Sequence, residues 1–426
     1  MSQTQKSDRS LMKQANQTLV LQLIQSRGPI SRKDIATVSG LSPASVTGIT
    51  GELIEHGLVH EVGEAEGDGR VGRRAVLLRL NPRAGVVVGV KLATQSVDCV
   101  LADLDAKVLQ AASVPLSFAD PGGRAQLAYD PQVMIQITIQ AIEQLLSMTE
   151  IDRARLLGIG VGVNGIVNPT TGVSHFAPHY GWRDVPLADP LAAHFGIPVY
   201  LENDARTLTL AEQWFGAGRG IDHFAAVAVG YGIGAGIVAN GRLYHGALGG
   251  AGEFGHTVIQ ADGPPCSCGR RGCIEAFAAI PAILRQVEDA LARSEPSALA
   301  RAEPLTLERI VGAADTGDQL ARRVLADAGR WLGFGLAGLV NILNPQLLIV
   351  TGEAVQCGRW YFEPMEATLR DLAFDGLAEA LQIRIEAGGN DIWARGSACV
   401  VLDALFTAPM HQGDIAPLRS AAAARV

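Results

Sequence analysis

The chain has 426 residues, of which 48% are apolar and 18% charged, and its formal net charge is −8 at pH 7. This composition excludes a disordered chain, and the length exceeds that of one compact core, so we expect two or three globular domains. The chain has no apolar run of membrane-spanning length and begins without the apolar segment of a signal peptide, so we expect a cytoplasmic protein with no membrane partner.

Charge and cysteine content differ along the chain. Residues 1–82 carry ten Lys and Arg against eight Asp and Glu, whereas the remainder is acidic. A mildly basic head on an acidic body is compatible with DNA binding through the head. The six cysteines form no regular framework, and three of them are clustered. This distribution is typical of a reducing compartment and one metal site.

The first 82 residues are predicted to form a winged helix-turn-helix domain that binds DNA. Apolar residues recur at helical spacing over 11–27. A capping-box-like start at Ser31 opens a short helix that ends near residue 38, and Ser42 followed by proline opens a third helix that ends near 56. Strands at 58–62 and 76–80 would flank a loop rich in glycine and arginine. Three helices with a tight second turn favour DNA binding, and a protein-docking bundle is the alternative.

The third helix is predicted to enter a major groove. Val46, Ile49 and Leu53 form its apolar stripe, so the small and hydroxyl residues near its start face outward. Arginines of the wing loop would reach phosphates or the adjacent minor groove. The predicted DNA contacts are Ser42, Ala44, Ser45, Thr47, Gly48, Thr50, Arg70, Arg73 and Arg74.

Strands and helices are predicted to alternate over the rest of the chain. The strand at 199–204 brings Asn203 and Asp204 to its carboxyl end, where ligands bind in α/β sheets. A helix at 394–406 follows, and residues 407–426 have little to bury and are expected to be a flexible tail. The other expected elements are a hairpin of strands at 85–90 and 97–104, a helix at 131–148, a strand at 156–163, a hairpin at 224–238, and helices at 280–293 and 307–343.

One imidazole and three thiols are clustered near the middle of the chain. His256 precedes Cys266, Cys268 and Cys273 within a single stretch of glycine-rich sequence. One histidine and three cysteines make a full tetrahedral ligand set, so they predict a structural Zn²⁺ site. The alternative is three buried thiols beside a surface histidine.

The sequence pattern around this cluster resembles the ROK family of repressors and sugar kinases. G-E-x-G-H followed by C-x-C-G-x-x-G-C-x-E carries the resemblance, and the sequence of the head is similar to the winged helix of ROK repressors. The resemblance implies an α/β, actin-like and hexokinase-like (ribonuclease H-like) domain of two lobes. One lobe would be residues 83–204 completed by the helix at 394–406, and the other residues 205–393 with the zinc loop.

The resemblance also implies a sugar site. In the kinases of the family, the aspartate that matches Asp204 removes a proton from the sugar hydroxyl. The matching sugar contacts here are Asn203, Asp204, Glu253, His256 and Glu275. His256 would bind zinc with one ring nitrogen and meet a sugar hydroxyl with the other.

Three motifs that face the nucleotide in ROK kinases depart from the family pattern. Lys91 stands at the place of the acid in D-x-G-G-T, the acid that organises Mg²⁺. Tyr231 replaces a small hydroxyl residue in the second phosphate loop, and Glu353 follows Gly352 where the adenosine loop has glycines. We therefore expect no catalytic residues and no enzymatic use of ATP.

The resulting hypothesis is a transcription regulator that represses genes of carbohydrate uptake or catabolism. A homodimer, or a dimer of dimers, would bind operator DNA and release it when a sugar effector closes the two lobes. One alternative is an ATP-dependent sugar kinase with a regulatory DNA-binding head. Another is a phosphotransferase protein, or a further protein partner, in place of the sugar.

Overall fold

The structure is a computed structural model, and it describes residues 2–64, 75–116, 129–301, 304–388 and 391–407. The chain divides into two compact units, which are described separately: Met1–Gly220 with Asp391–Val426, and Ile221–Asn390. Among the described helices, none is both long and apolar enough to cross a membrane.

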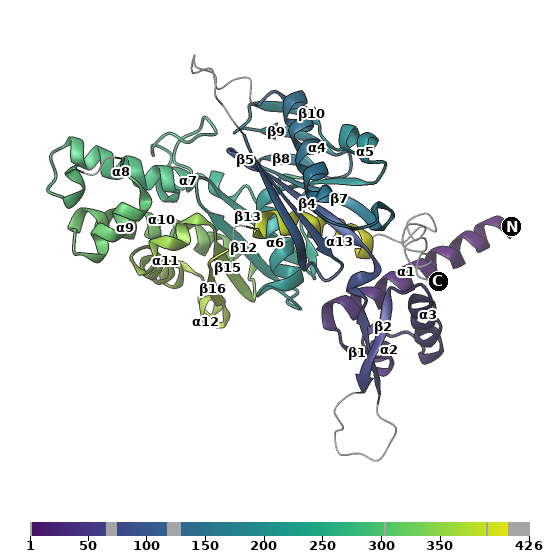
Figure 1. Cartoon of the computed structure of the whole chain (residues 1–426). Coiled ribbons are helices and arrows are strands. Elements are labelled where there is room, and N and C mark those ends of the chain that lie inside the picture. Colours follow the sequence, from purple (N-terminus) through teal and green to yellow (C-terminus); the bar gives the residue numbers. More distant parts are fainter. Residues whose placement is uncertain (1, 65–74, 117–128, 302–303, 389–390, 408–426) are drawn as a thin grey trace. The chain divides into compact units, whose positions relative to one another are not determined.

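The head of the first unit has the predicted winged helix-turn-helix order (Figure 1). Ser31 and Ser42 each cap a helix by accepting a hydrogen bond from the backbone N–H three residues on. The first helix begins at Ser2 rather than at residue 11. The three strands pair in the order β1-β3-β2. The elements are α1 (Ser2–Arg27), β1 (Ile30–Ser31), α2 (Arg32–Ser39), α3 (Pro43–Glu55), β2 (Val59–Glu64), β3 (Val76–Leu80) and η1 (Pro82–Ala84).

The body of the first unit is built on a five-stranded sheet of order β11-β7-β4-β5-β6. Helix α4 packs on β5 and β6, and the predicted hairpin, α4 and β7 are confirmed. Strands β11, β7 and β4 are parallel, so their carboxyl ends share one edge. The elements are β4 (Val86–Leu92), β5 (Ser96–Asp103), β6 (Val108–Pro115), α4 (Pro131–Ser147), η2 (Arg153–Arg155), β7 (Leu156–Val163), β8 (Ile166–Asn168), β9 (Val173–Ala177), β10 (Trp182–Pro186), α5 (Ala188–Phe195), β11 (Val199–Asn203), α6 (Asp204–Phe215) and α13 (Ile392–Thr407).

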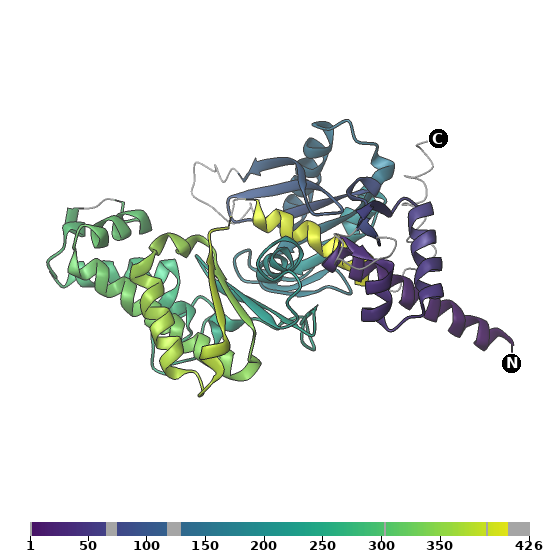
Figure 2. The same cartoon turned by 90° about the horizontal axis from the view of Figure 1, so that it is seen from below.

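Helix α13 lies directly on glycines of this sheet, beside α6 (Figures 1 and 2). A Cβ added at Gly89 would stand 1.9 Å from the carbonyl oxygen of Ala394, and one at Gly160 would stand 1.8 Å from that of Ser397. Both carbonyls belong to the backbone of α13 and have no rotamer that moves them away. The helix can occupy this position only because β4 and β7 carry no side chain there.

The second unit is a five-stranded sheet of order β14-β13-β12-β15-β16 packed against helices. Its core joins strand residues such as Val227 and Val350 to Leu332 and Leu336 of α10. The predicted hairpin and the helix at 280–293 are confirmed, and the predicted helical stretch 307–343 consists of two helices, α9 and α10. The elements are β12 (Phe224–Val229), β13 (Ile233–Ala239), β14 (Arg242–Leu243), η3 (Phe254–His256), α7 (Glu275–Ala278), α8 (Ile280–Ala292), η4 (Ala298–Arg301), α9 (Leu307–Asp315), α10 (Gln319–Leu343), β15 (Leu347–Thr351), η5 (Glu353–Cys357), α11 (Arg359–Leu372), α12 (Leu377–Ala380) and β16 (Gln382–Glu386).

The border between the units differs from the predicted border between residues 204 and 205. Helix α6 begins at Asp204, packs along α13 and belongs to the first unit, which extends to Gly220. Because α6 packs on α13, β7 and β11, the helix belongs to the core of the first unit, and the border falls after it. In the predicted tail, residues 408–426 lie outside the described part of the chain.

Replacing Gly160 by Ala is expected to destabilise the protein by about 1–3 kcal/mol, because the added methyl overlaps the backbone of α13. Gly312→Ala is the matched control: no atom lies within 4 Å of its added Cβ. The free energy of unfolding of this control should rise by about 0.5–1 kcal/mol, because alanine restricts the unfolded chain more than glycine does. Urea unfolding of both full-length variants measures the difference, and equal shifts would contradict the packing argument.

Candidate functional site

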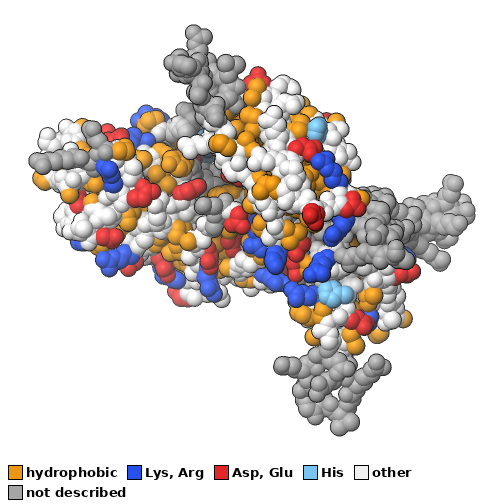
Figure 3. All heavy atoms as spheres, viewed as in Figure 1, with side chains coloured by type: hydrophobic (Ala, Val, Ile, Leu, Met, Phe, Trp, Pro, Cys, Tyr) orange, Lys and Arg blue, Asp and Glu red, His pale blue; other side chains and the backbone are white. Residues whose placement is uncertain are grey.

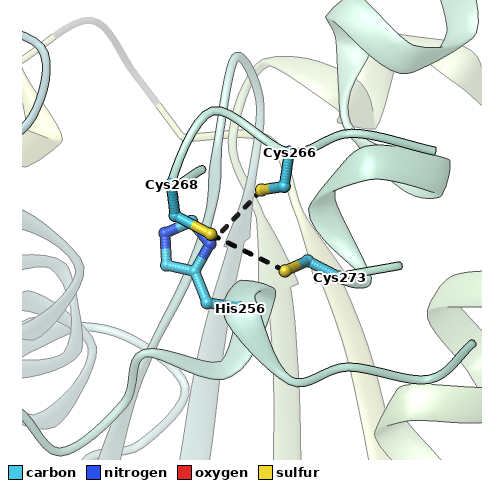
Figure 4. A group of neighbouring side chains, drawn as sticks. All are labelled: His256, Cys266, Cys268 and Cys273. Atoms are coloured by element: carbon cyan, nitrogen blue, oxygen red, sulfur yellow. Dashed lines mark hydrogen bonds between the residues drawn. The ribbon is translucent and has the colours of Figure 1, made fainter. Parts of the chain in front are cut away.

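The four predicted metal ligands lie together in the second unit (Figure 4). Their ligand atoms are all within 4.8 Å of one another. Cys266 Sγ is 3.6 Å from His256 Nδ1, and Cys268 Sγ is 3.8 Å from Cys273 Sγ. Cys273 is fully buried and the other three side chains are partly exposed.

The loop reaches this shape through two glycines in left-handed conformation, Gly269 with φ 84° and Gly272 with φ 73°. A Cβ on Gly272 would stand 1.6 Å from the carbonyl oxygen of Gln260, so the chain crosses itself closely there. The backbone N–H of Cys266 donates to the carbonyl of Arg270, which closes the turn that carries the first two thiols.

These distances fit a tetrahedral metal site. Zinc–ligand bonds of about 2.3 Å to sulfur and about 2.0–2.1 Å to nitrogen place two thiolates about 3.8 Å apart, and a thiolate and an imidazole nitrogen about 3.5–3.6 Å apart. The observed separations match both values. Burial raises the pKa of the Cys273 thiol to about 12, so a cation that binds at neutral pH displaces its proton. The four side chains can hold a metal ion.

The acids beside this cluster have local partners. Glu275 accepts hydrogen bonds from the backbone N–H of Ile233 at 3.1 Å and from the hydroxyl of Ser267 at 2.7 Å, so it links the start of β13 to the cysteine loop. Glu253 lies 4.0 Å from Nε2 of His256. The sugar contacts predicted for Glu253, His256 and Glu275 stay a prediction.

In the first unit, Asn203 and Asp204 lie where β11 passes into α6. The side chain of Asn203 caps α6 by accepting from the N–H of Arg206, and its amide donates to the carbonyl of Gly165 at 2.9 Å. This second bond fastens the loop after β7 to the end of β11. In that loop Asn164 is 8% exposed, and its Oδ1 atom forms no hydrogen bond with a described residue.

Asp204 forms an ion pair with Lys91 from the end of β4. The Nζ atom of Lys91 is 2.6 Å from Oδ2 of Asp204, and the ammonium lies 5.0 Å from the ring centroid of Trp393 on α13. Lys91, on β4, and Glu202, on β11, are both in register with Gly162 of the intervening strand. The space above Gly162 is taken by Ser397 of α13 and Thr207 of α6, which lie closest to a Cβ added there.

This pair sets the charge state of Asp204. Burial raises the pKa of the carboxyl, but the Lys91 ammonium, its hydrogen bond and the N–H of Ala205 lower it, and the net pKa lies below the usual value. The carboxylate therefore stays ionised and paired at neutral pH, and such a group is a weak proton acceptor.

The second phosphate-loop motif holds an acid of the same unit. Gly230 and Gly232 flank Tyr231 in the turn between β12 and β13, and Tyr231 is 70% exposed. A Cβ added at Gly230 would stand 1.9 Å from Oε2 of Glu353. The carboxylate of Glu353 thus packs against the turn that matches the second phosphate loop of the family.

On the head, five of the predicted DNA contacts are exposed on α3 or at its start: Ser42, Ala44, Ser45, Thr47 and Gly48. The prediction for Thr50 is wrong, because its side chain is fully buried and its hydroxyl accepts a hydrogen bond from Arg32 at 3.0 Å. Thr50 follows buried Ile49 and faces α2 rather than solvent. The other predictions, Arg70, Arg73 and Arg74, lie outside the described residues.

The face shown in Figure 3 carries charged side chains of both signs. Lys and Arg are interspersed with Asp and Glu over much of the face shown in Figure 3. This mixture agrees with the net charge of −8. The architecture of the head, rather than the surface charge, therefore indicates DNA binding.

Comparison with known proteins identifies the family. The sequence profile of the ROK family matches residues 87–404. The chain belongs to the ROK family. The profile of the MarR family matches residues 14–62, within the winged helix-turn-helix head. Together with the fold, these matches confirm a winged head followed by an actin-like ROK domain.

Two curated relatives that extend over most of the chain are named as a repressor and as a transcriptional dual regulator. The xylose repressor of Caldicellulosiruptor bescii is 31% identical over 380 residues, or 88% of this chain and 92% of the relative. The DNA-binding transcriptional dual regulator NagC of Escherichia coli K12 is 34% identical over 381 residues, or 89% and 91%.

Solved structures include both regulators and kinases. A ROK family transcriptional regulator, a homolog of the E. coli MLC protein, aligns with a TM-score of 0.80 at 30% identity and covers 97% of this chain and 100% of its own. A ROK family glucokinase from Streptomyces griseus, solved with glucose and AMPPNP, aligns with a TM-score of 0.62 at 27% identity and covers 74% and 99%.

Sequence reasoning missed the contacts that give the altered motifs their meaning. It identified Lys91 and Glu353 as departures, but not that Lys91 pairs with Asp204 or that Glu353 packs on Gly230. A lysine at the place of an acid, in a chain that keeps the opposing aspartate, is the signal that indicates the first contact.

Lys91→Met is expected to lower stability at pH 7 by about 1–3 kcal/mol, because it leaves Asp204 partly buried without its charged donor. The pKa of Asp204 is lowered in the folded state, so the pair stabilises above the unfolded value of about 3.9 and its contribution is lost as pH falls through the folded pKa. Urea unfolding between pH 7 and pH 3 should show the deficit shrinking in the acid range. A deficit that is independent of pH would contradict the ion-pair argument, and Lys107→Met is the control for loss of an exposed lysine.

Proposed function

We propose that the protein is a sugar-responsive transcriptional repressor that binds operator DNA through its winged head. The observation that carries this proposal is the match over 97% of the chain, head included, to a ROK family transcriptional regulator. The names of two relatives, a xylose repressor and the DNA-binding transcriptional dual regulator NagC, support it. Repression of genes for carbohydrate uptake or catabolism follows as the expected role.

The start of α3 supports close approach to DNA. Gly48 and Gly51 each cost a helix about 1 kcal/mol relative to alanine, yet no atom lies within 4 Å of a Cβ added at either position. Packing within the chain therefore does not require these glycines. Close approach of a groove wall to the exposed face of α3 would require them. Two heads in a homodimer, or in a dimer of dimers, would read a palindromic operator.

The sugar effector is proposed to bind at the carboxyl edge of the sheet in the first unit. Asp204 accepts hydrogen bonds, and Asn164 offers an oxygen that no described residue satisfies. Sugar hydroxyls donate to such atoms. Asn203 acts there by holding the Asn164–Gly165 loop in place. Glu253, His256 and Glu275 are proposed as sugar contacts on the resemblance to the family alone.

We propose that the chain has no phosphoryl-transfer activity. Asp204 is held ionised by Lys91, which opposes its use as a general base. Glu353 brings a negative charge against Gly230 in the turn where a kinase of the family would meet phosphate. Phosphate is itself anionic, so the acid opposes its binding.

The metal is proposed to be a structural zinc ion held by His256, Cys266, Cys268 and Cys273. Zinc is the ion that one imidazole and three thiolates select at tetrahedral geometry. When bound, it would supply no chemistry to a ligand but would hold the loop closed around η3 and α7.

Cys268→Ser is expected to lose the metal, because three ligands with one hard oxygen bind zinc far more weakly than a complete set. Elemental analysis of the purified full chain measures the metal content. Ser267→Ala is the matched control in the same loop, since Ser267 bonds Glu275 and is outside the ligand set. Stoichiometric zinc in Cys268→Ser would contradict the ligand assignment.

The effector test combines DNA binding with a sugar panel. An operator is first selected from random-sequence duplexes with the full chain, and binding is then titrated with D-xylose, D-glucose and N-acetyl-D-glucosamine, alone and as phosphate monoesters. One sugar should weaken operator binding at millimolar concentration, and saturation near 100 Kd should stabilise the protein by about 2.7 kcal/mol in a thermal-shift assay. Release by none of them would refute this effector class.

The same panel with MgATP tests the proposal that the chain is no kinase. We expect no ADP above background, with or without sugar. Sugar-dependent ADP production that is lost in Asp204→Asn would instead establish a sugar kinase with a DNA-binding head.

A further inference from the structure

The Lys91–Asp204 pair lies at the proposed sugar site, and the family pattern does not account for its lysine. We propose that Lys91 contacts the effector and determines its specificity: with Asp204 it forms a donor–acceptor pair for one free hydroxyl of a neutral sugar. This inference rests on the proposed function and names the chemistry of the effector that the site accepts.

The position of the pair makes it accessible to a ligand. Both residues come from carboxyl ends of parallel strands, the edge at which α/β sheets bind ligands. The Lys91 side chain is 13% exposed and that of Asp204 24% exposed, so both charged groups are largely desolvated but still reach solvent. Asn164, with its unsatisfied oxygen, follows the strand between them.

The ammonium has hydrogen-bonding capacity to spare. An ammonium group carries three N–H donors. The bond to Asp204 is the only one that the side chain of Lys91 makes to a described residue, and the ring of Trp393 holds the cation by its face without accepting a second in-line bond. Two donors therefore remain for a ligand, on a group whose position is fixed from two sides.

The chemistry of the pair favours a hydroxyl over a phosphate. Lys91 only donates and Asp204, held ionised, only accepts, whereas a hydroxyl does both. One sugar hydroxyl can accept from Lys91 and donate to Asp204 at the same time. A phosphate ester at that oxygen has no proton for Asp204 and brings a charge of about −1.5 to −2 against the carboxylate.

The pair thus gives this position a role opposite to the one it has in a kinase. An acid that organises Mg²⁺ beside a general base prepares a hydroxyl for phosphorylation. A lysine paired with that base neutralises it and leaves the hydroxyl as the group that is recognised. The expected effector is a sugar that is unphosphorylated at this position. The deoxy analogue at this position should bind poorly, because it can neither accept a hydrogen bond from Lys91 nor donate one to Asp204.

The test is calorimetric titration of the full chain with D-xylose, D-glucose and N-acetyl-D-glucosamine, together with their phosphate monoesters and deoxy analogues. Lys91→Met keeps the aliphatic stem and removes the donors. It should bind the free sugar at least about tenfold more weakly, because the lost hydrogen bond involves a charged donor. It should also discriminate less between that sugar and its deoxy analogue. Lys107→Met, at the far end of the hairpin, should bind as the wild type does.

A double-mutant cycle keeps the test independent of folding. Lys91→Met combined with Asp204→Asn is neutral at both positions, so no unpaired carboxylate remains to destabilise the variant. If the two residues hold one hydroxyl, the losses of the single variants should not add, and the double variant should lose less than their sum.

Three results would overturn the proposal. Wild-type affinity for the free sugar in Lys91→Met would show that the lysine makes no contact, while the repressor function stands. Tighter binding of a phosphate monoester than of the free sugar, lost in Lys91→Met, would make Lys91 a phosphate ligand. Failure of every sugar to bind the wild type would remove the sugar effector of the proposed function and this inference with it.

Discussion

The contact on which the first unit depends is the seating of α13 on the glycines of β4 and β7. Gly89 and Gly160 leave no room for even a methyl group beneath its backbone. Because the helix lies this close, its first turn brings Trp393 to the ammonium of Lys91, and the helix also packs along α6, the helix that Asp204 begins. The packing of a late helix thus fixes the surroundings of two groups that lie more than a hundred residues apart in sequence.

The two altered phosphate motifs place opposite charges in the two units. The first motif gains a cation, Lys91, which is neutralised by Asp204. The second meets an anion, Glu353, packed on Gly230. An isolated buried charge costs several kcal/mol, so each such change persists only where a partner or solvent compensates it. At Asp204 the compensation is specific, because the same carboxylate that a kinase would use as a base becomes the partner of the lysine. The lysine at the place of the cation-binding acid and the retained Asp204 therefore depend on each other.

Local patterns made most of the elements predictable, whereas contacts between distant residues were not. Periodicity and caps such as Ser31 and Ser42 identified the helices of the head, because these signals act over three or four residues. The ligands His256 to Cys273 were predictable because the donor set lies in one loop. The prediction that Thr50 contacts DNA was wrong, because helical periodicity shows which side of a helix a residue lies on but not which neighbour covers it. Here that neighbour is Arg32. The ion pair of Lys91 depends on the order of the strands in the sheet, which one sequence does not display.

The route between ligand and head follows from the same helix. Trp393 begins α13 beside Lys91, and α13 also packs against α1 of the head, where Arg219 donates to the carbonyl of Gln25 at 3.3 Å. A ligand that engages Lys91 as proposed would act on the first turn of a helix that packs closely on glycines of the sheet. Coupling of about 1–3 kcal/mol is typical of allosteric proteins, and it is reciprocal, so operator DNA must weaken sugar binding by the same factor by which sugar weakens DNA binding. Helix α13 contacts both Lys91 and the head, so it is a physical element through which sugar binding and DNA binding can affect each other.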